Sequence, residues 1–325
     1  MGSLLATITG QFGKPLILGT MLPVVLALIV FASIVAPRLG VEGPLGPWGK
    51  GPEGWALDFG FATLFLVGLL YSLNAQVQRL FEGYPWRSSL LGRWCTARFQ
   101  AELDDLRTRR RHLIALKESP GLDPVLQAKI GSRLARLTEY LRSEFPQRSS
   151  VLPTRLGNIV RAAENYPRDE YGISSIPAWP RLVAVLPKEY ASQMDDGKVT
   201  LDFFLNSSLL SAVSALVLLF FALPEAGAGL GAFVGWLAEV AGASFASVLF
   251  YRFALSPAKH WGGLFKGAFD LYRWLLLKQL GYQHLPIDVD RFAERDLWKG
   301  ISKQFLFGDR SEYERDHGPW IERYR

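Results

Sequence analysis

Residues 16–36 read LILGTMLPVVLALIVFASIVA and contain no charged side chain. A helix needs about 20 mostly apolar residues to cross the hydrocarbon core of a bilayer, so this stretch predicts a transmembrane helix. Pro23 lies inside it and predicts a kink rather than an end, because neighbouring groups can satisfy the freed backbone carbonyl. A cleaved signal peptide would have a basic start and a short apolar core, whereas here the start is nearly uncharged and the apolar run is long.

Three further apolar blocks lie at Trp55–Leu73, Phe203–Leu223 and Leu230–Phe253. The Gly- and Pro-rich segment Pro37–Gly54 separates the first two blocks, and the short Pro224–Gly229 separates the last two. Gly and Pro in such numbers are typical of turns. We therefore expect an all-α polytopic membrane protein with four transmembrane helices in two hairpins and a helical cytoplasmic region.

This pattern divides the chain into four segments. Residues 1–73 would hold an N-terminal segment and the first transmembrane hairpin, and 74–200 a cytoplasmic helical region. Residues 201–255 would form the second hairpin, and 256–325 an amphipathic interfacial helix with a cytoplasmic tail.

Lys and Arg are distributed very unevenly around the four blocks. Of the 36 basic residues, 33 lie in 74–200 or 252–325, and only Arg38 and Lys50 lie on the opposite side of a four-span chain. Basic residues are enriched in cytoplasmic loops, so both termini and the middle region are expected in the cytoplasm. Topology thereby explains the net charge of +6, and no nucleic-acid partner is expected. Arg exceeds Lys and no eukaryotic sorting signal is visible, which favours a bacterial plasma (inner) membrane.

The middle region predicts two helices, Cys95–Glu118 and Val125–Phe145, joined by a short Pro/Gly turn. Their apolar residues recur at spacings of three and four, which is typical of an antiparallel helical hairpin. The first helix also carries the densest basic cluster. This cluster could contact an anionic lipid or a nucleic acid, but we favour a solvated helix face balanced by nearby carboxylates. Its members are Arg107, Arg109, Arg110 and Arg111.

Two other segments suggest the membrane surface. Ser149–Lys198 is punctuated by Pro and mixes aromatic with charged residues, which suits a collar at the headgroups. Trp261–Tyr282 carries four charges near one face of an otherwise apolar helix, so it fits a helix in the bilayer surface or one buried against the collar. A fifth span there would place four charges in lipid. Asp288–Arg325 predicts one more amphipathic helix with a charged, aromatic end.

Glu239 is the residue that most directly suggests a site, because it lies near the middle of the fourth block. Ionisable side chains in spans usually face a bundle interior or a water-filled cavity. A tight second hairpin would bring Ser214 to a similar depth, and Ser211 lies on the same face as Ser214. We therefore predict an intramembrane polar site of Glu239, Ser211 and Ser214. It would either handle a proton or a cation or serve as a hydrogen-bonded packing group, and we favour packing.

Small residues form a stripe beside Glu239. Gly231, Gly235 and Gly242 lie near one helical face, and Gly231 and Gly235 make a Gly-x-x-x-Gly step. Such stripes let helices approach closely, so we predict a helix-packing role for the three glycines.

The sequence contains no motif that indicates a reaction, a metal or a nucleotide. Cys95 is the single cysteine, and no two of the four histidines have the i, i+4 spacing of a helical metal pair. We therefore expect no enzymatic activity, no cofactor and no metal site.

The order of two spans, a large helical region, two spans and a tail is similar to that of bestrophin-type anion channels. Arg79–Gly83 (RLFEG) resembles the polar segment that follows their second span. The resemblance covers this one short stretch and implies an oligomeric channel. Two functions are therefore carried forward. The favoured one is a non-enzymatic integral membrane scaffold or interaction protein that docks a protein partner or copies of itself. The alternative is an oligomeric ion channel or transporter with Glu239 near the permeation path.

Overall fold

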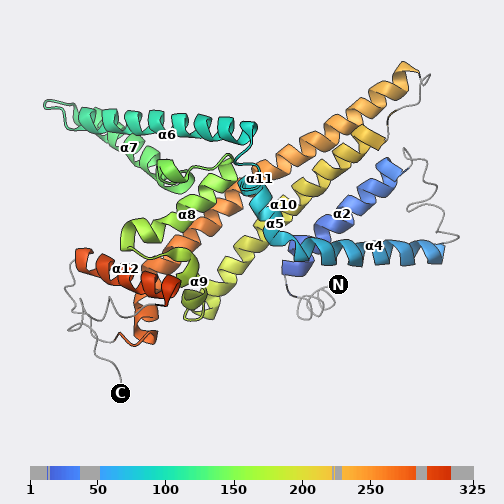
Figure 1. Cartoon of the computed structure of the whole chain (residues 1–325). Coiled ribbons are helices and arrows are strands. Elements are labelled where there is room, and N and C mark those ends of the chain that lie inside the picture. Colours follow the sequence, from blue (N-terminus) through green and yellow to red (C-terminus); the bar gives the residue numbers. More distant parts are fainter. Residues whose placement is uncertain are drawn as a thin grey trace. The chain divides into compact units, whose positions relative to one another are not determined.

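The computed structural model describes residues 13, 15–36, 52–221, 223, 229–282 and 291–308, with side chains omitted at 52–58, 291 and 307. This part of the chain is helical and contains no strand, so the all-α prediction is confirmed for it (Figure 1). In chain order its elements are η1 (Pro15–Met21), α2 (Leu22–Val30), η2 (Phe31–Val35), α4 (Pro52–Ser72), α5 (Asn74–Glu82), α6 (Leu90–Lys117), α7 (Pro124–Glu144), η3 (Arg148–Ser150), α8 (Arg155–Tyr171), α9 (Ser175–Val183), α10 (Lys188–Phe221), α11 (Leu230–Gln279) and α12 (Arg291–Phe307).

Three of the helical stretches are long and apolar enough to cross a membrane: Pro15–Val35, α10 and α11. A fourth candidate exists if α4 and α5 are counted as one span. Together they are long and apolar enough to cross a membrane, but they bend by 59° at the break between them. The four apolar blocks of the sequence thus correspond to three or four candidate spans. The predicted connections in 37–51 and 224–228 lie outside the described residues.

The chain forms two compact units, each made of two separate segments. Unit 1 contains residues 1–81 and 195–258, and unit 2 contains residues 82–194 and 259–325. The candidate spans therefore contribute to unit 1, whereas the predicted middle region and tail combine in unit 2. Both α10 and α11 are continuous helices that contribute residues to each unit.

In unit 1 the first span packs through two apolar clusters. Val24 and Leu28 of α2 contact Val67 of α4, and Val35 contacts Leu218 of α10. These β-branched and leucine side chains carry no polar atom, so they can pack against one another at any depth of an apolar layer. The first span is thereby attached to both α4 and α10.

Unit 2 begins with the predicted helical hairpin, in which α6 and α7 lie side by side (Figure 1). Ser89 caps α6 and Asp123 caps α7, because each side chain accepts a hydrogen bond from a backbone N–H of the first turn. Gly121 in the turn has a φ of +81°, a conformation that favours glycine. Leu103 and Phe145 are buried where the hairpin closes on Val151.

The main core of unit 2 is built from α8, α9, α11 and α12. Trp298 of α12 and Phe269 of α11 are its largest fully buried side chains. Trp179, within the predicted collar, packs its ring against those of Phe265 and Phe269. Burying aromatic surface of this size is a major source of stability for a helical domain.

The structure corrects two helix boundaries. The helix expected over Trp261–Tyr282 is present, but it is joined to the fourth apolar block, because α11 runs unbroken through Pro257 to Gln279. Ala254 and Ala258 are fully buried on either side of that proline, so tertiary packing outweighs the lost backbone hydrogen bond. The sequence left two placements open for this segment, in the bilayer surface or against the collar. Its apolar face is buried in the core of unit 2 against Trp179, which lies in the collar segment.

The second correction concerns the third span. The apolar block predicted at Phe203–Leu223 is the last part of a 34-residue helix that starts at Lys188. Residues 188–202 contain no proline, so nothing in them ends the helix where the hydropathy falls. The tail helix predicted within Asp288–Arg325 is present as α12, and residues 309–325 lie outside the described part of the chain.

Candidate functional site

The strongest candidate site in unit 1 is a pocket between the first span, α10 and α11. Its volume is about 360 Å³. Most of its wall is apolar, with Pro23 and Leu26 from the first span and Ala243 and Phe250 from α11. A small apolar pocket inside a bundle of candidate spans is the kind of place where a polar side chain acquires a function.

Three side-chain to backbone hydrogen bonds hold the helices around this pocket. Asn206 Nδ2 donates to Gly19 O of the first span at 2.8 Å, joining it to α10. Ser208 Oγ donates to Ser247 O at 2.9 Å, and Trp236 Nε1 donates to Leu218 O at 2.8 Å, joining α10 to α11. Such bonds tie helices together where water is scarce. These bonds join α10 to both of the other helices that line the pocket.

The structure brings the predicted polar residues together. Glu239 of α11 and Ser211 and Ser214 of α10 all line this pocket, and Ser207 joins them. Among the described residues that line it, Glu239 carries the one ionisable side chain. Ser214 Oγ donates to Leu210 O at 2.9 Å within its own helix. Its single proton is thus used, and Ser214 can offer Glu239 an acceptor.

The glycines predicted to pack against a neighbouring helix are Gly231, Gly235 and Gly242. Gly242 lines the pocket, and a Cβ added at Gly242 or Gly231 would meet no atom within 4 Å in the described part of this chain. Gly235 is half-buried on the same helix. Close helix packing at Gly231 and Gly242 is therefore not seen among the described residues, and the helix-packing role of the three glycines stays a prediction.

Chemically, the pocket offers one carboxyl and three hydroxyls inside an apolar wall. A carboxylate there can bind a proton or a small cation, and hydroxyl oxygens can accept hydrogen bonds or coordinate a cation. The described residues hold no group of three or more His, Cys, Asp or Glu side chains that could bind a metal ion. One carboxyl beside three hydroxyls suits the binding and release of a proton or a small cation.

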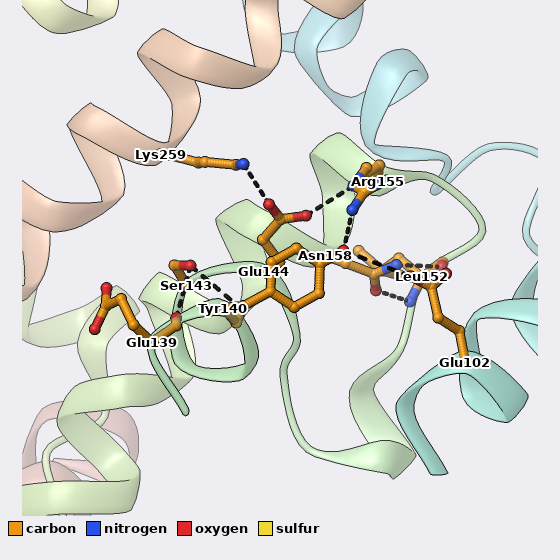
Figure 2. A network of polar contacts seen from close by, with 9 residues as sticks. All are labelled: Glu102, Glu139, Tyr140, Ser143, Glu144, Leu152, Arg155, Asn158 and Lys259. Atoms are coloured by element: carbon orange, nitrogen blue, oxygen red, sulfur yellow. Dashed lines mark hydrogen bonds and ion pairs between the residues drawn. The ribbon is translucent and has the colours of Figure 1, made fainter. Parts of the chain in front are cut away.

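Unit 2 contains a polar network centred on Glu144, the last residue of α7. Figure 2 shows its carboxylate between Lys259 of α11 and Arg155 of α8, with Tyr140 one helical turn before it. The Glu144 side chain is almost completely buried, and Arg155 Nε lies 2.7 Å from Oε2. Two cations thereby neutralise a carboxylate that would be costly to bury alone.

Two neighbours complete this network. Arg155 also donates to the Tyr140 hydroxyl, and the Asn158 side chain pairs with both backbone groups of Leu152, accepting at 2.7 Å and donating at 3.1 Å (Figure 2). Burial raises the pKa of Tyr140 to about 12, and the negative charge of Glu144 acts in the same direction. Glu144 raises the pKa of Arg155 against the effect of burial. Glu144 is thus held by two basic side chains from two other helices, as expected of a structural network.

A second polar cluster joins α8, α11 and α12. Asp270 accepts hydrogen bonds from Tyr166 at 2.9 Å and from Tyr171 at 2.6 Å. Arg273, one turn further along α11, pairs with Glu294 of α12 at 2.7 Å and stacks over the Tyr171 ring. Burial and these bonds raise the pKa of Tyr171, which keeps the hydroxyl protonated as a donor.

Sequence reasoning missed the Glu144 network, although one signal pointed to it. The apolar stripe of α7 includes Leu137 and Leu141, and continuing it by three residues reaches Glu144. A carboxylate on the buried face of a helix needs a cation nearby. Neither cation could be identified from the pattern, because Arg155 belongs to the next α-helix and Lys259 lies far along the chain.

Comparison with known proteins finds no protein-family model, no curated protein and no solved structure that matches this chain. Its class therefore rests on its own features: the described residues are helical, and three or four of their helices are long and apolar enough to cross a membrane. The bestrophin-like layout gains no support from these comparisons.

Proposed function

We propose that this chain is a multi-pass membrane protein that acts, as an oligomer, as an ion channel or transporter in which Glu239 binds and releases a proton or small cation. The observation that carries the proposal is the grouping of Glu239 with Ser207, Ser211 and Ser214 around one pocket between three candidate spans. Ionisable residues inside spans are costly and commonly mark ion or proton pathways. A packing role alone would not require a pocket beside the carboxyl.

The exposed surface of α11 supports the oligomer. Within the most apolar 18-residue stretch of α11, only 6% of the residues are buried by the described part of the chain. Such a face must be covered by lipid or by another copy. Because these spans expose few polar side chains, a water-filled path needs residues from several copies.

The orientation is part of the proposal. Both termini and residues 74–200 lie on the cytoplasmic side of a bacterial plasma membrane. The chain has four spans in two hairpins, and α4 with α5 forms the second span. The basic-residue asymmetry supports this topology. The bend of 59° between α4 and α5 then falls close to the cytoplasmic boundary, where Asn74 donates to the buried Asp202 of α10 at 2.8 Å.

A scaffold role is the second candidate, and one surface feature favours it. The ends of α6 and α7 beside their connecting turn expose Leu116, Val125 and Leu126. Exposed apolar side chains at the tip of a long hairpin suit the docking of a protein partner. This role needs no enzymatic activity and no cofactor.

Flux through liposomes separates the two candidates. Glu239→Gln keeps the shape of the side chain but cannot ionise, so pH-dependent cation or proton flux should be lost while the protein stays folded. Ser244→Ala is the matched control, because Ser244 is an exposed hydroxyl on the same helix whose proton goes to Val240 O. Flux that continues unchanged in Glu239→Gln, or no flux in the parent protein at any pH, would remove the transport function. The scaffold would then be the better account.

A further inference from the structure

Unit 2 contains a larger pocket that the proposed transport function does not use. It has a volume of about 910 Å³ and lies between α6, α7 and α8. Four of the side chains that line it are arginines: Arg107, Arg110, Arg111 and Arg142. Cations from two helices thus meet around one space large enough for a small organic molecule.

Helical spacing explains why three members of the basic cluster gather there. Arg107, Arg110 and Arg111 are separated by three and four residues, so they share the face of α6 that lines the pocket. Arg109 lies on another face and pairs with Asp105 at 2.8 Å. The basic cluster therefore occupies two faces of α6, and among its four arginines only Arg109 has a carboxylate partner within the described residues.

The carboxylates around the pocket are already used. Asp104 pairs with Arg148 at 3.0 Å, and Glu170 lies 3.7 Å from Arg142. Asp169 accepts from the Gln147 amide at 2.8 Å. The acidic groups therefore leave the three arginines of α6 largely uncompensated.

Those arginines make only neutral contacts in the described part of the chain. Arg110 Nε and Arg111 Nη2 each lie 3.1 Å from a threonine hydroxyl, of Thr138 and Thr108 respectively. Arg107 is exposed and has no ion-pair partner among the described residues. Three guanidinium groups with no carboxylate partner on one face form a strong site for an anion.

A second observation comes from α8. Asn165 lines the same pocket, is only 5% exposed, and its Nδ2 has no hydrogen-bond partner within the described residues. A buried amide donor without an acceptor is costly. An anionic oxygen bound in the pocket would be an acceptor close to it.

We propose that this pocket binds a phosphate-bearing molecule. Arginine forks match phosphate oxygens in bidentate geometry, and a phosphate group carries more charge than a carboxylate. The volume exceeds what a phosphate group alone would fill, and Phe145 and Tyr166 provide apolar wall for the rest of the ligand. The phosphate belongs either to a lipid headgroup or to a soluble phosphoester.

Binding to the full-length protein in nanodiscs tests this site. One arm titrates inorganic pyrophosphate into protein held in phosphatidylcholine nanodiscs and follows binding by calorimetry. The other arm compares the thermal unfolding midpoint in phosphatidylcholine with that in nanodiscs that also contain phosphatidic acid. A pyrophosphate response identifies a soluble ligand, and a phosphatidic acid response identifies a lipid headgroup.

Matched variants decide whether the response belongs to the pocket. Combined Arg107→Gln, Arg110→Gln and Arg111→Gln should weaken binding by about tenfold or more, because each charge-assisted hydrogen bond contributes strongly. Arg109→Gln removes one positive charge from the other face of α6, as Arg107→Gln does from the pocket face. It should leave binding close to that of the parent. Arg107→Gln alone should give an intermediate loss of binding. Because the Arg107 side chain is exposed, this variant should stay folded, so unfolding would not explain the loss. No response in either arm, or an equal loss in Arg107→Gln and Arg109→Gln, would overturn the proposal.

Discussion

Lys259 on α11 forms an ion pair with Glu144 at the end of α7, and the two side chains differ greatly in exposure, with 42% of Lys259 and 3% of Glu144 accessible. Arg155 provides the second cation to the same carboxylate. The buried member is thus the anion, and both cations can reach water when the pair is broken. Stability of unit 2 should therefore depend on whether Glu144 keeps at least one cation.

Replacing both cations tests this dependence. Lys259→Met or Arg155→Met alone leaves Glu144 one partner and should cost little. The double variant leaves a buried, unpaired carboxylate and should cost about 3–5 kcal/mol. The measurement is the thermal unfolding midpoint of the full-length protein in detergent. Arg168→Met is the control, because Arg168 is half-exposed and 3.7 Å from Asp169, so its loss should cost about 1 kcal/mol or less. A double variant as stable as this control would contradict the role of Glu144.

Tyr140 predicts how unit 2 responds to alkaline pH. Burial, helped by Glu144, raises its pKa from 10.0 to about 12. Between pH 10 and pH 12, the folded protein therefore keeps the Tyr140 phenol proton, whereas the unfolded chain loses it. The stability from this group is fully present below pH 10 and is lost as the pH rises through 12. The unfolding midpoint should fall less between pH 9 and pH 11 in Tyr140→Phe than in the parent. Equal slopes would show that Tyr140 is not responsible.

Two helical glycines of unit 2 should respond oppositely to alanine. A Cβ at Gly157 in α8 would overlap the carbonyl oxygen of Glu82, whereas a Cβ at Gly131 in α7 would meet nothing within 4 Å. Gly131→Ala should stabilise by about 0.5–1 kcal/mol, because alanine loses less backbone entropy in a helix. Gly157→Ala should destabilise by about 1–3 kcal/mol, because backbone must move. Thermal unfolding of both variants in one detergent compares them directly. A destabilised Gly131→Ala would contradict the open space beside Gly131.

The sequence predicted those features that depend on local pattern. The α6–α7 hairpin was predictable because apolar spacing and the Pro/Gly turn are encoded within 90–144. Glu239 and Ser214 were predicted to meet because a short connection places two helices antiparallel. Both predictions need only helix geometry and nearby sequence.

Features that depend on distant segments could not be predicted. The length of α11 beyond Pro257 depends on tertiary packing, which local propensity does not contain. The pairing of Lys259 with Glu144 and the meeting of Asn165 with the arginines of α6 need the relative placement of helices far apart in the sequence. The basic cluster illustrates this, because a single run of arginines splits into one paired residue and three that line a pocket.

Cysteine labelling tests the proposed orientation. Cys95 is the single cysteine, so Cys95→Ser provides a clean background. A cysteine at position 46 should react with an impermeant maleimide added outside intact cells, and Ser119→Cys should react only after lysis. Ser119 is preferred to Gly121, because Gly121 has a positive φ that strains other residues. The reverse labelling pattern would invert the topology.

Disulfide cross-linking tests whether copies meet along α11. Gly242 is exposed within the chain and borders the Glu239 pocket, so a second copy packed there would cover the carboxyl. In the Cys95→Ser background, Gly242→Cys should then form a dimer band on mild oxidation, because a disulfide needs Cα atoms about 4.4–6.8 Å apart. Ser244→Cys is the matched control, because position 244 lies at nearly the same depth on the opposite side of the helix. Equal cross-linking at both positions would indicate random collision. A monomer at both would mean that lipid covers this face, and the proposed path at Glu239 would then have to form within one chain.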